Sequence, residues 1–541
     1  MRLFWHRRDL RVADNRGLAA AAEAAEDDGA VVPVFVFDDD VLDHAASPRV
    51  RFMLDALAEL RDDYRERGSD LVVARGDPAE VLPDLADEFG AEAVVWNEDY
   101  SGLARERDAR VRMALDDAGV ARETHHDAVH HEPGTITTNQ GDPYAVFTYF
   151  WKKWRDREKA DPFDAPVAAD LVDAGAAGDI GEVAAGQSLP SIADLGFEEP
   201  TADVQSAGTA AARDRLAAFR EDAVLRYDED RDYPAKEATS RLSADLKWGT
   251  IGVREVYAAT EEAMTRAESM AGDDGEHDGD DDSGPVASVE EFRSQLAWRE
   301  FYAQVLWANP EVVTENYKEY EHPIDWRAGE EAMTDLRAWK EGETGYPIVD
   351  AGMRQLREEA YMHNRVRMIV ASFLTKDLLL DWRHGYEHFK QHLADHDTAN
   401  DTGGWQWAAS TGTDAQPYFR IFNPMTQGER YDPDGEYISE YVPELAPLPD
   451  EHLVRPAKAP LVVQDEAGVR IGEDYPRPVV DYERRAAAAR ETYARLDDRA
   501  KEALSDPRVR RRGSFSQRRR DADDGTGGSR PDDGQTSLDD F

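Results

Sequence analysis

Apolar residues in the first part of the chain fall into short β-branched runs that are separated by longer segments with helical spacing. Runs over 31–37, 71–74 and 91–96 alternate with helix-type patterns over 49–67 and 78–89. This alternation predicts a doubly wound parallel sheet with helices on both faces. We therefore expect an α/β domain over about residues 1–130.

The pattern changes in the second half of the chain. Over about 207–495 apolar residues recur every three to four positions with few strand signals, which predicts an all-helical domain. Residues 131–206 are expected to form an interdomain linker, since much of this stretch is rich in Ala, Gly, Asp and Pro. An acidic, Gly-rich insert at 271–285 lacks EF-hand spacing and is predicted to be a solvated loop. Low-complexity residues 504–541 are predicted to be disordered.

Composition restricts the environment and the chemistry. The formal net charge is −49, from 64 Lys+Arg against 113 Asp+Glu. Molar salt would screen such a charge to within about 3 Å, so we expect a halophilic cell. The absence of cysteine excludes disulfides, thiolate metal sites and cysteine nucleophiles, and no metal site is predicted. Without a long apolar run or a leader-like start, a soluble cytoplasmic protein is expected.

Three segments of the second half concentrate Trp, Arg, Asn and Asp: WREFY at 298–302, YMHNRVRM at 361–368 and DHDTANDTGGWQWAAS at 395–410. Such grouping suits a flat, charged, aromatic cofactor. No GxGxxG or Walker loop follows a strand of the first domain, although its sheet still offers a ligand crevice at the switch point. The segment ATSRLS could supply pyrophosphate donors at a helix start, but taken alone it is better explained as an ordinary capping cluster before a helix.

Longer motifs make the chain similar to the cryptochrome/photolyase family, and most similar to its class I cyclobutane dimer photolyases. They are FWHRRDLRVADN at 4–15, TSRLSADLKWGTIG at 239–252, TGYPIVDAGMRQL at 344–356, MHNRVRMIVASFLTKDLLLDW at 362–382 and GGWQWAASTGTDAQPYFRIFNP at 403–424. The resemblance covers nearly everything up to about residue 495. It implies light-driven repair of pyrimidine dimers in DNA by electron transfer from photoexcited reduced FAD.

The resemblance also places FAD in the helical domain. It implies a buried ion pair between Arg367 and Asp395 beside the flavin ring, where a guanidinium would stabilise the anionic reduced form. A buried ion pair with a purely structural role would give the same contact. The residues implied to hold FAD are Tyr227, Thr239, Ser240, Arg241, Leu242, Ser243, Arg299, Asn364, Arg367, Asp395, Asp397 and Asp401.

Further roles follow from the same resemblance. Trp405, Trp382 and Trp326 resemble the electron-transfer chain that reduces oxidised flavin. Trp298 and Trp407 resemble the pair that wedges the dimer, while Gln295, Asn364 and Met368 match positions that contact it. Arg299, Arg365 and Arg420 resemble residues that hold DNA phosphates. In molar salt the electrostatic part of DNA affinity is small, so stacking and hydrogen bonding must contribute more.

Two positions depart from the dimer photolyases. Gln295 replaces their usual Glu and is commoner in (6-4) photolyases, which nevertheless carry histidines where this chain reads MHNRVRM. Asp401 stands where they have Asn and where plant cryptochromes have Asp, so a blue-light photoreceptor remains an alternative. A flavoprotein that only binds its cofactor is a third possibility, against which the Trp298 and Trp407 pair argues.

The first domain most resembles photolyases that carry an 8-hydroxy-5-deazaflavin antenna, with methenyltetrahydrofolate as the second choice. By that likeness Phe35, Arg49 or Arg51, Asp99 and Lys247 would line the chromophore. At the end of the tail, residues 535–541 read QTSLDDF. Gln535, Leu538 and Phe541 match the QxxLxxF pattern by which repair enzymes dock on the sliding clamp. A monomer is expected.

Overall fold

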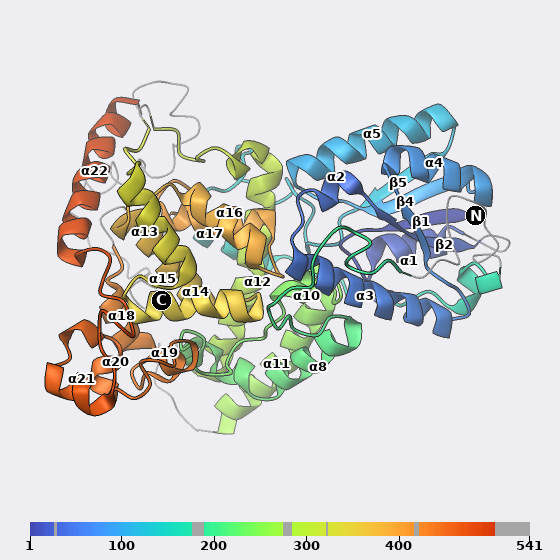
Figure 1. The fold of residues 1–541 in the computed structure, drawn as a ribbon. Coiled ribbons are helices and arrows are strands. Elements are labelled where there is room, and N and C mark those ends of the chain that lie inside the picture. The colour runs from blue at the N-terminus through green and yellow to red at the C-terminus, as the bar shows by residue number, and fades with distance from the viewer. Residues whose placement is uncertain (26–29, 176–188, 274–283, 321–322, 416–420, 504–541) are drawn as a thin grey trace, which may run out of the picture.

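The computed structural model describes residues 1–25, 30–175, 189–273, 284–320, 323–415 and 421–503, and Figure 1 shows them as two domains side by side. The first is built on one five-stranded parallel sheet with the order β3-β2-β1-β4-β5. Its strands are β1 (Arg2–His6), β2 (Val31–Phe37), β3 (Val72–Arg75), β4 (Ala93–Asn97) and β5 (Ala121–His125). The predicted doubly wound sheet is confirmed, with its switch point between β1 and β4.

Helices cover both faces of this sheet. Leu18 of α1 (Arg16–Glu23) and Leu57 of α3 (Ser47–Glu66) belong to the apolar cluster that holds Phe4 of β1. The opposite cluster contains Trp5 and residues of α4 (Pro78–Phe89) and α5 (Gly102–Ala118). Successive side chains of a strand point to opposite faces, so β1 contributes to both cores and its sequence is apolar without alternation.

Helix α4 has the bounds that the sequence predicts because its ends are encoded locally. The side chain of Asp77 caps the helix by accepting a hydrogen bond from the backbone N–H of Ala79, and Pro78 occupies the first turn. Gly90 ends the helix with φ +61°. That left-handed conformation favours glycine.

The second domain is helical, and every named strand of the described residues lies in the first domain. Figure 1 shows it running from green α8 to red α22 at the far edge. Its longer helices are α8 (Thr209–Glu221), α11 (Val253–Asp273), α12 (Pro285–Ala308), α13 (Glu330–Glu341), α14 (Pro347–Glu359), α15 (Asn364–Ser372), α16 (Trp382–His392), α17 (Thr398–Ala408), α18 (Pro424–Tyr431) and α22 (Tyr482–Ala503). Its shorter helices are α9 (Tyr227–Asp230), α10 (Ser243–Trp248), α19 (Glu436–Tyr441), α20 (Asp450–Leu453) and α21 (Leu461–Ala467). The first domain also contains a short helix, α2 (Asp39–Leu42).

The segment expected to be a linker contains one helix that belongs to a core. Helix α6 (Phe147–Asp156) buries Phe147, Phe150 and Trp154 in the same apolar cluster as α12. Its apolar residues recur at helical spacing, which the Ala- and Gly-rich composition of the neighbouring residues obscures. Part of 131–206 therefore packs with the helical domain.

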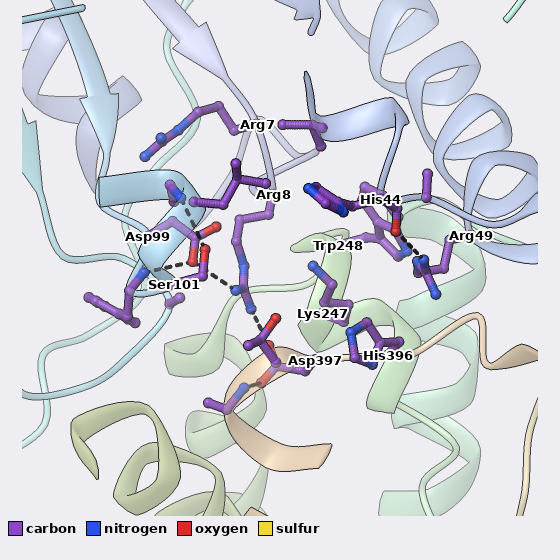
Figure 2. Close-up of a pocket in the computed structure, with 18 of the residues that line it drawn as sticks. Arg7, Arg8, His44, Arg49, Asp99, Ser101, Lys247, Trp248, His396 and Asp397 are labelled. Carbon is purple, nitrogen blue, oxygen red and sulfur yellow. Dashed lines mark hydrogen bonds and ion pairs between the residues drawn. The ribbon is translucent and has the colours of Figure 1, made fainter. Parts of the chain in front are cut away.

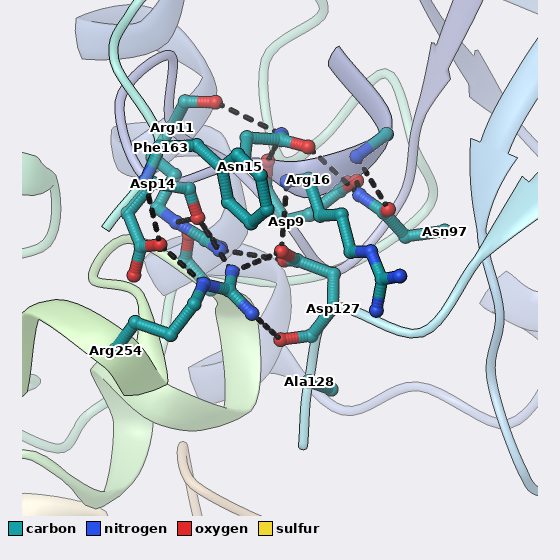
Figure 3. Close-up of polar contacts among 12 residues, drawn as sticks. Asp9, Arg11, Asp14, Asn15, Arg16, Asn97, Asp127, Ala128, Phe163 and Arg254 are labelled. Atoms are coloured by element: carbon teal, nitrogen blue, oxygen red, sulfur yellow. Dashed lines mark hydrogen bonds and ion pairs between the residues drawn. The ribbon is translucent and has the colours of Figure 1, made fainter. Parts of the chain in front are cut away.

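A buried ionic network joins the two domains, as Figure 3 shows. Arg254, in the first turn of α11, binds the carboxylates of Asp14 and Asp127, and Arg11 also binds Asp127, at 2.5 Å. All four side chains are at most 3% exposed. Gly252 permits the approach, since a Cβ there would lie 1.8 Å from Asp14 Oδ2. The FWHRRDLRVADN and KWGTIG motifs thus form one interdomain contact.

None of the helices in the described part of the chain combines the length and apolarity needed to cross a bilayer.

Candidate functional site

The predicted ion pair is present in the helical domain. Arg367 of α15 donates from Nη2 to Asp395 Oδ2 at 2.7 Å and from Nε to the carbonyl of Met362 at 2.7 Å. Asp395 is 6% exposed and lies just before α17. Burial opposes the charge of Arg367, but the carboxylates of Asp395 and Asp401 raise its pKa above the usual value. The guanidinium is therefore a permanent cation in this site.

Two buried polar atoms of the helical domain have no hydrogen-bond partner among the described residues. They are Asp395 Oδ1 and the indole Nε1 of Trp405, on the adjacent helix α17. Leaving such a group unpaired costs about 1–3 kcal/mol. A fixed cation with an unpaired carboxylate oxygen beside it fits a polar, anionic ligand such as a flavin.

Trp405 and Trp382 lie in one core. The Trp405 ring packs on Gly385 so closely that a Cβ there would lie 2.0 Å from it, and Gly385 is one helical turn from Trp382 in α16. Trp382 is fully buried and donates from Nε1 to Asn316 Oδ1 at 2.9 Å. Trp326 is partly buried against the same cluster, with its ring 6.4 Å from that of Tyr493. The structure thus brings the three tryptophans into one region.

Trp298 lies on α12 and packs against other aromatic rings. Its ring stacks on Phe147 with centroids 3.8 Å apart and 11° between the planes, and Tyr302 lies 5.4 Å away. Trp407 is 8% exposed on α17, which packs against α12 because Gly403 leaves room for the Tyr302 ring. Both predicted wedge residues therefore come from adjacent helices.

The side chains of the other predicted lesion contacts differ in their exposure and in their hydrogen bonds. Asn364 is exposed at the start of α15, and its Nδ2 lies 3.9 Å from Met368 Sδ one turn later. Gln295 precedes Trp298 by one turn of α12 and donates from Nε2 to Glu291 Oε1 at 2.7 Å. The Gln295 amide is thus oriented by a carboxylate that also binds Arg231.

The ATSRLS segment forms a loop before α10. The backbone N–H of Leu242 donates to Ser240 Oγ at 3.4 Å, and Arg241 has φ +54°. Leu242 is buried, Thr239 and Ser240 are half-buried, and Ser243 is exposed. Arg241 binds Glu359 at 2.9 Å, while the Tyr227 hydroxyl sits in an aromatic core where burial raises its pKa to about 12.

A cavity of about 450 Å³ lies between the two domains, at the carboxyl ends of β1, β2 and β4 (Figure 2). This is the switch point of the sheet, where ligands of doubly wound folds bind. Phe35, Met53 and Trp248 supply apolar wall. The lining cations are Arg7, Arg8, Arg49, Arg107, Lys247, Arg299 and Lys390, against only three carboxylates, Asp38, Asp99 and Asp397. In a chain of net charge −49, this excess of cations marks a site for an anion.

Arg8 links the domains across this cavity by binding Asp99 at 3.2 Å and Asp397 at 2.8 Å. Burial would raise the pKa of Asp397, but Arg8, Lys247 and Arg299 hold it well below the usual range. The same effects set the pKa of Asp99 to about 2. Burial and the charge of Arg8 lower the pKa of Lys247 to about 8, and Figure 2 shows its ammonium pointing into the cavity.

Tertiary packing distinguishes the two candidate arginines of α3. Arg49 lines the cavity and donates to the carbonyls of His44 and Lys390. Arg51 instead binds Asp55 and Glu199, outside the cavity lining. Of the predicted antenna residues, Phe35, Arg49, Asp99 and Lys247 meet at this cavity.

Asp401 is 8% exposed and bound to a histidine that the sequence reading did not identify. His396 Nδ1 lies 2.5 Å from Asp401 Oδ2, and His396 also lines the interdomain cavity. Burial lowers the pKa of His396 against the opposing effect of this hydrogen bond. Asp401 also acts electrostatically on Arg367 and on Arg49, so the His396–Asp401 pair lies close to both the Arg367 site and the cavity.

Two of the three predicted phosphate-binding arginines, Arg299 and Arg365, are already bound within the protein. Arg299 donates to the carbonyls of Ala128 and Leu246 and lines the interdomain cavity. Arg365 is 2% exposed, pairs with Asp232 and lies over the Tyr431 ring. Arg420 and the tail residues Gln535, Leu538 and Phe541 lie outside the described residues.

Sequence reasoning also missed the role of Arg8. Two successive arginines directly after strand β1, at the switch point of the sheet, were the signal that could have identified it. His396 gives a weaker signal, because its partner is five residues away and a contact at that spacing depends on the bend before α17.

Comparisons with known proteins agree with this arrangement. The family model for DNA photolyase matches residues 2–168, and the model for the FAD binding domain of DNA photolyase matches residues 292–495. The deoxyribodipyrimidine photo-lyase of Halobacterium salinarum is 60% identical over 492 residues, which cover 90% of this chain and 97% of the relative. That of a Synechococcus species is 38% identical over 512 residues, covering 93% and 98%.

Solved structures show the same fold. A bacterial class III photolyase from Agrobacterium tumefaciens superposes with a TM-score of 0.79 at 35% identity, covering 92% of this chain and 98% of that one. An archaeal photolyase from Sulfolobus tokodaii with two FAD molecules gives 0.73 at 30% identity, covering 91% and 99%.

Proposed function

The chain belongs to the DNA photolyase family, and we propose that it is a deoxyribodipyrimidine photo-lyase that uses light to reverse cyclobutane pyrimidine dimers in DNA. The observation that carries this proposal is the buried Arg367–Asp395 pair, whose Asp395 Oδ1 has no partner among the described residues, inside the segment that matches the FAD-binding domain. When bound there, FAD supplies the light-driven electron transfer that splits the dimer.

The chain's own residues provide charge and geometry. Arg367 holds a positive charge that cannot be lost, and Asp395 fixes its orientation through one short hydrogen bond. The Trp405 and Trp382 rings, which belong to one buried apolar cluster, offer a route for electrons into the site. Trp298, supported by Phe147, and Trp407 form walls that stack on the flipped lesion and exclude water.

The direct test is repair itself. Purified protein in molar KCl is reduced, mixed with an oligonucleotide containing one thymine dimer, and exposed to near-ultraviolet or blue light. We expect the dimer to revert to two thymines in the light and to persist in the dark. A photoreceptor or a flavoprotein without repair activity would show flavin absorption but no light-dependent loss of the dimer, and that result would reject the proposal. A matched substrate with one (6-4) lesion tests the other alternative.

The interdomain cavity would hold an antenna chromophore, for which an anionic 8-hydroxy-5-deazaflavin is the first choice. Its cations favour an anion, and its apolar walls of Phe35, Met53 and Trp248 favour a flat ring. Methenyltetrahydrofolate is the second choice. A second flavin would also satisfy the charge, and the Sulfolobus tokodaii photolyase structure holds two FAD molecules. The absorption spectrum of chromophore released from purified protein separates the three.

The segment Gln535–Phe541 would dock on a sliding clamp through Leu538 and Phe541, which fall on one face of a single helical turn. Calorimetry of a synthetic peptide of this segment with the cognate clamp tests the proposal. We expect affinity in the micromolar range, typical of a small interface that folds on binding, and none for the Phe541→Ala peptide. Absence of binding by the unaltered peptide would reject it.

A further inference from the structure

The basic helix α6 lies directly behind the Trp298 wall. Residues 147–159 carry five basic residues, Lys152, Lys153, Arg155, Arg157 and Lys159, against two acidic ones, Asp156 and Glu158, in a chain whose formal charge is −49. The formal charge of this segment is therefore opposite in sign to that of the whole chain. A surface of net positive charge attracts an anionic partner.

The outer face of α6 combines charge with an aromatic surface. Lys152 and Lys153 are exposed, and within the described residues neither has a hydrogen-bond or ion-pair partner. Tyr149 precedes them by about one turn and is 47% exposed, among the largest exposed fractions of any aromatic residue described. Arg157 and Lys159, in contrast to these lysines, already donate hydrogen bonds to the backbone carbonyls of Thr135 and Trp154.

The inner face of α6 packs against Trp298. Phe147 stacks on Trp298 with centroids 3.8 Å apart, and the Trp151 ring lies nearly parallel to Phe147, 12° from its plane and 6.5 Å away. Arg155 lies over the Trp151 ring at 5.9 Å. The outer face is therefore held at a fixed position relative to Trp298.

Two of the three arginines predicted to hold DNA phosphates already have partners within the protein. Arg299 and Arg365 are committed to backbone carbonyls and to Asp232 inside the protein. From these contacts we infer that the outer face of α6 is a binding site for single-stranded DNA next to the lesion, in which Lys152 and Lys153 bind phosphates and Tyr149 stacks on a base. The inference rests on the proposed function, because it places the lesion at Trp298. Basic grooves with exposed aromatic rings are typical of single-strand binding.

Two variants separate the charge from the stacking. Binding of a fluorescent single-stranded oligonucleotide with one dimer is measured by anisotropy between about 0.5 M and about 3 M KCl. Lys152→Gln with Lys153→Gln should lower the slope of log K against log[KCl] by about 1.4, since each phosphate contact on single-stranded DNA contributes about 0.7. The matched control Arg337→Gln with Arg484→Gln removes two exposed charges from α13 and α22 and should leave the slope unchanged. Equal slopes for wild type and the lysine variant, or an equal drop in the control, overturn the inference.

Tyr149→Ala should weaken binding about five-fold at every salt concentration, the low end of the stacking contribution for a partly exposed ring. Tyr149→Phe retains the ring and should bind like wild type. A loss in both variants, or in neither, contradicts the assignment of a stacking role. If an acidic peptide binds α6 and DNA binding does not respond to these substitutions, the partner is a protein and the inference is wrong.

Separate measurements test the proposed repair function and the proposed DNA-binding site on α6. Wild-type repair of an isolated dinucleotide dimer, which has no flanking strand, tests the proposed function without α6. Binding of the undamaged single strand, compared between wild type and the lysine variant, tests α6 without any repair. Absence of repair alone would reject the enzyme and leave the α6 measurement intact.

Discussion

Replacing Arg254 by methionine should destabilise the contact between the two domains strongly. Arg254 is 3% exposed at its side chain and is bound by two carboxylates, Asp14 and Asp127, that are themselves almost fully buried. Removal of the cation would leave both carboxylates in a poorly solvated site with less positive charge to balance their negative charge. Breaking a buried pair in this way costs about 3–5 kcal/mol, a large part of the 5–15 kcal/mol that typically stabilises a domain.

Thermal unfolding in molar KCl, followed by circular dichroism, measures this cost. At roughly 2–4 °C per kcal/mol for a domain of this size, Tm should fall by about 6–20 °C. Arg213→Met is the matched control. It removes an arginine of α8 that binds Glu255 at 2.6 Å but is 47% exposed, so less than about 1 kcal/mol is expected. Equal effects of the two substitutions would show that burial of the Arg254 network contributes nothing, and the reasoning would be refuted.

The same network predicts a pH dependence. Burial opposes ionisation of Asp127, but Arg11 and Arg254 lower its pKa from 3.8 to about 2. A carboxyl whose pKa is lower in the folded state stabilises the fold above its unfolded pKa, and this contribution is lost as pH falls through the folded value. The shift corresponds to about 2.5 kcal/mol, lost between about pH 4 and pH 2. In Arg254→Met the acid-dependent loss should be smaller, and an unchanged acid profile would contradict the assignment.

Three further predictions concern function. Trp298→Ala should weaken dimer binding and repair by about 5- to 160-fold while FAD stays bound, since stacking worth about 1–3 kcal/mol is removed and the Arg367 site is not; loss of flavin absorbance from the purified variant would contradict this. Trp405→Phe should block photoreduction of oxidised flavin yet spare repair by protein that is already reduced, and equal loss of both activities in a single-turnover assay would argue against an electron route. Affinity for an anionic antenna should fall as pH rises through about 8, where Lys247 loses its charge, and Lys247→Arg should bind equally well on both sides of that pH in a spectral titration.

Much of the architecture is determined by local sequence. Helix α4 lies where the apolar spacing places it because Asp77, Pro78 and Gly90 fix its ends through contacts within a few residues. The strands β2 and β4 follow from β-branched runs that are apolar on both faces. The Arg367–Asp395 pair and the grouping of Trp405 with Trp382 were predicted from motifs rather than from periodicity, and the structure contains both.

What the local sequence could not determine is which polar side chains are buried and with which partners. Arg49 and Arg51 lie two residues apart on one helix, and only packing of α3 against α16 places Arg49 at the cavity and leaves Arg51 with Asp55. Arg299 and Arg365 have the residue type of phosphate binders, but carbonyls and a carboxylate from distant segments bind them first. Arg8 meets Asp397 across 389 positions of the chain. Secondary structure reflects neighbours within a turn or a strand, whereas the charge and burial of a site depend on segments that only the tertiary fold brings together.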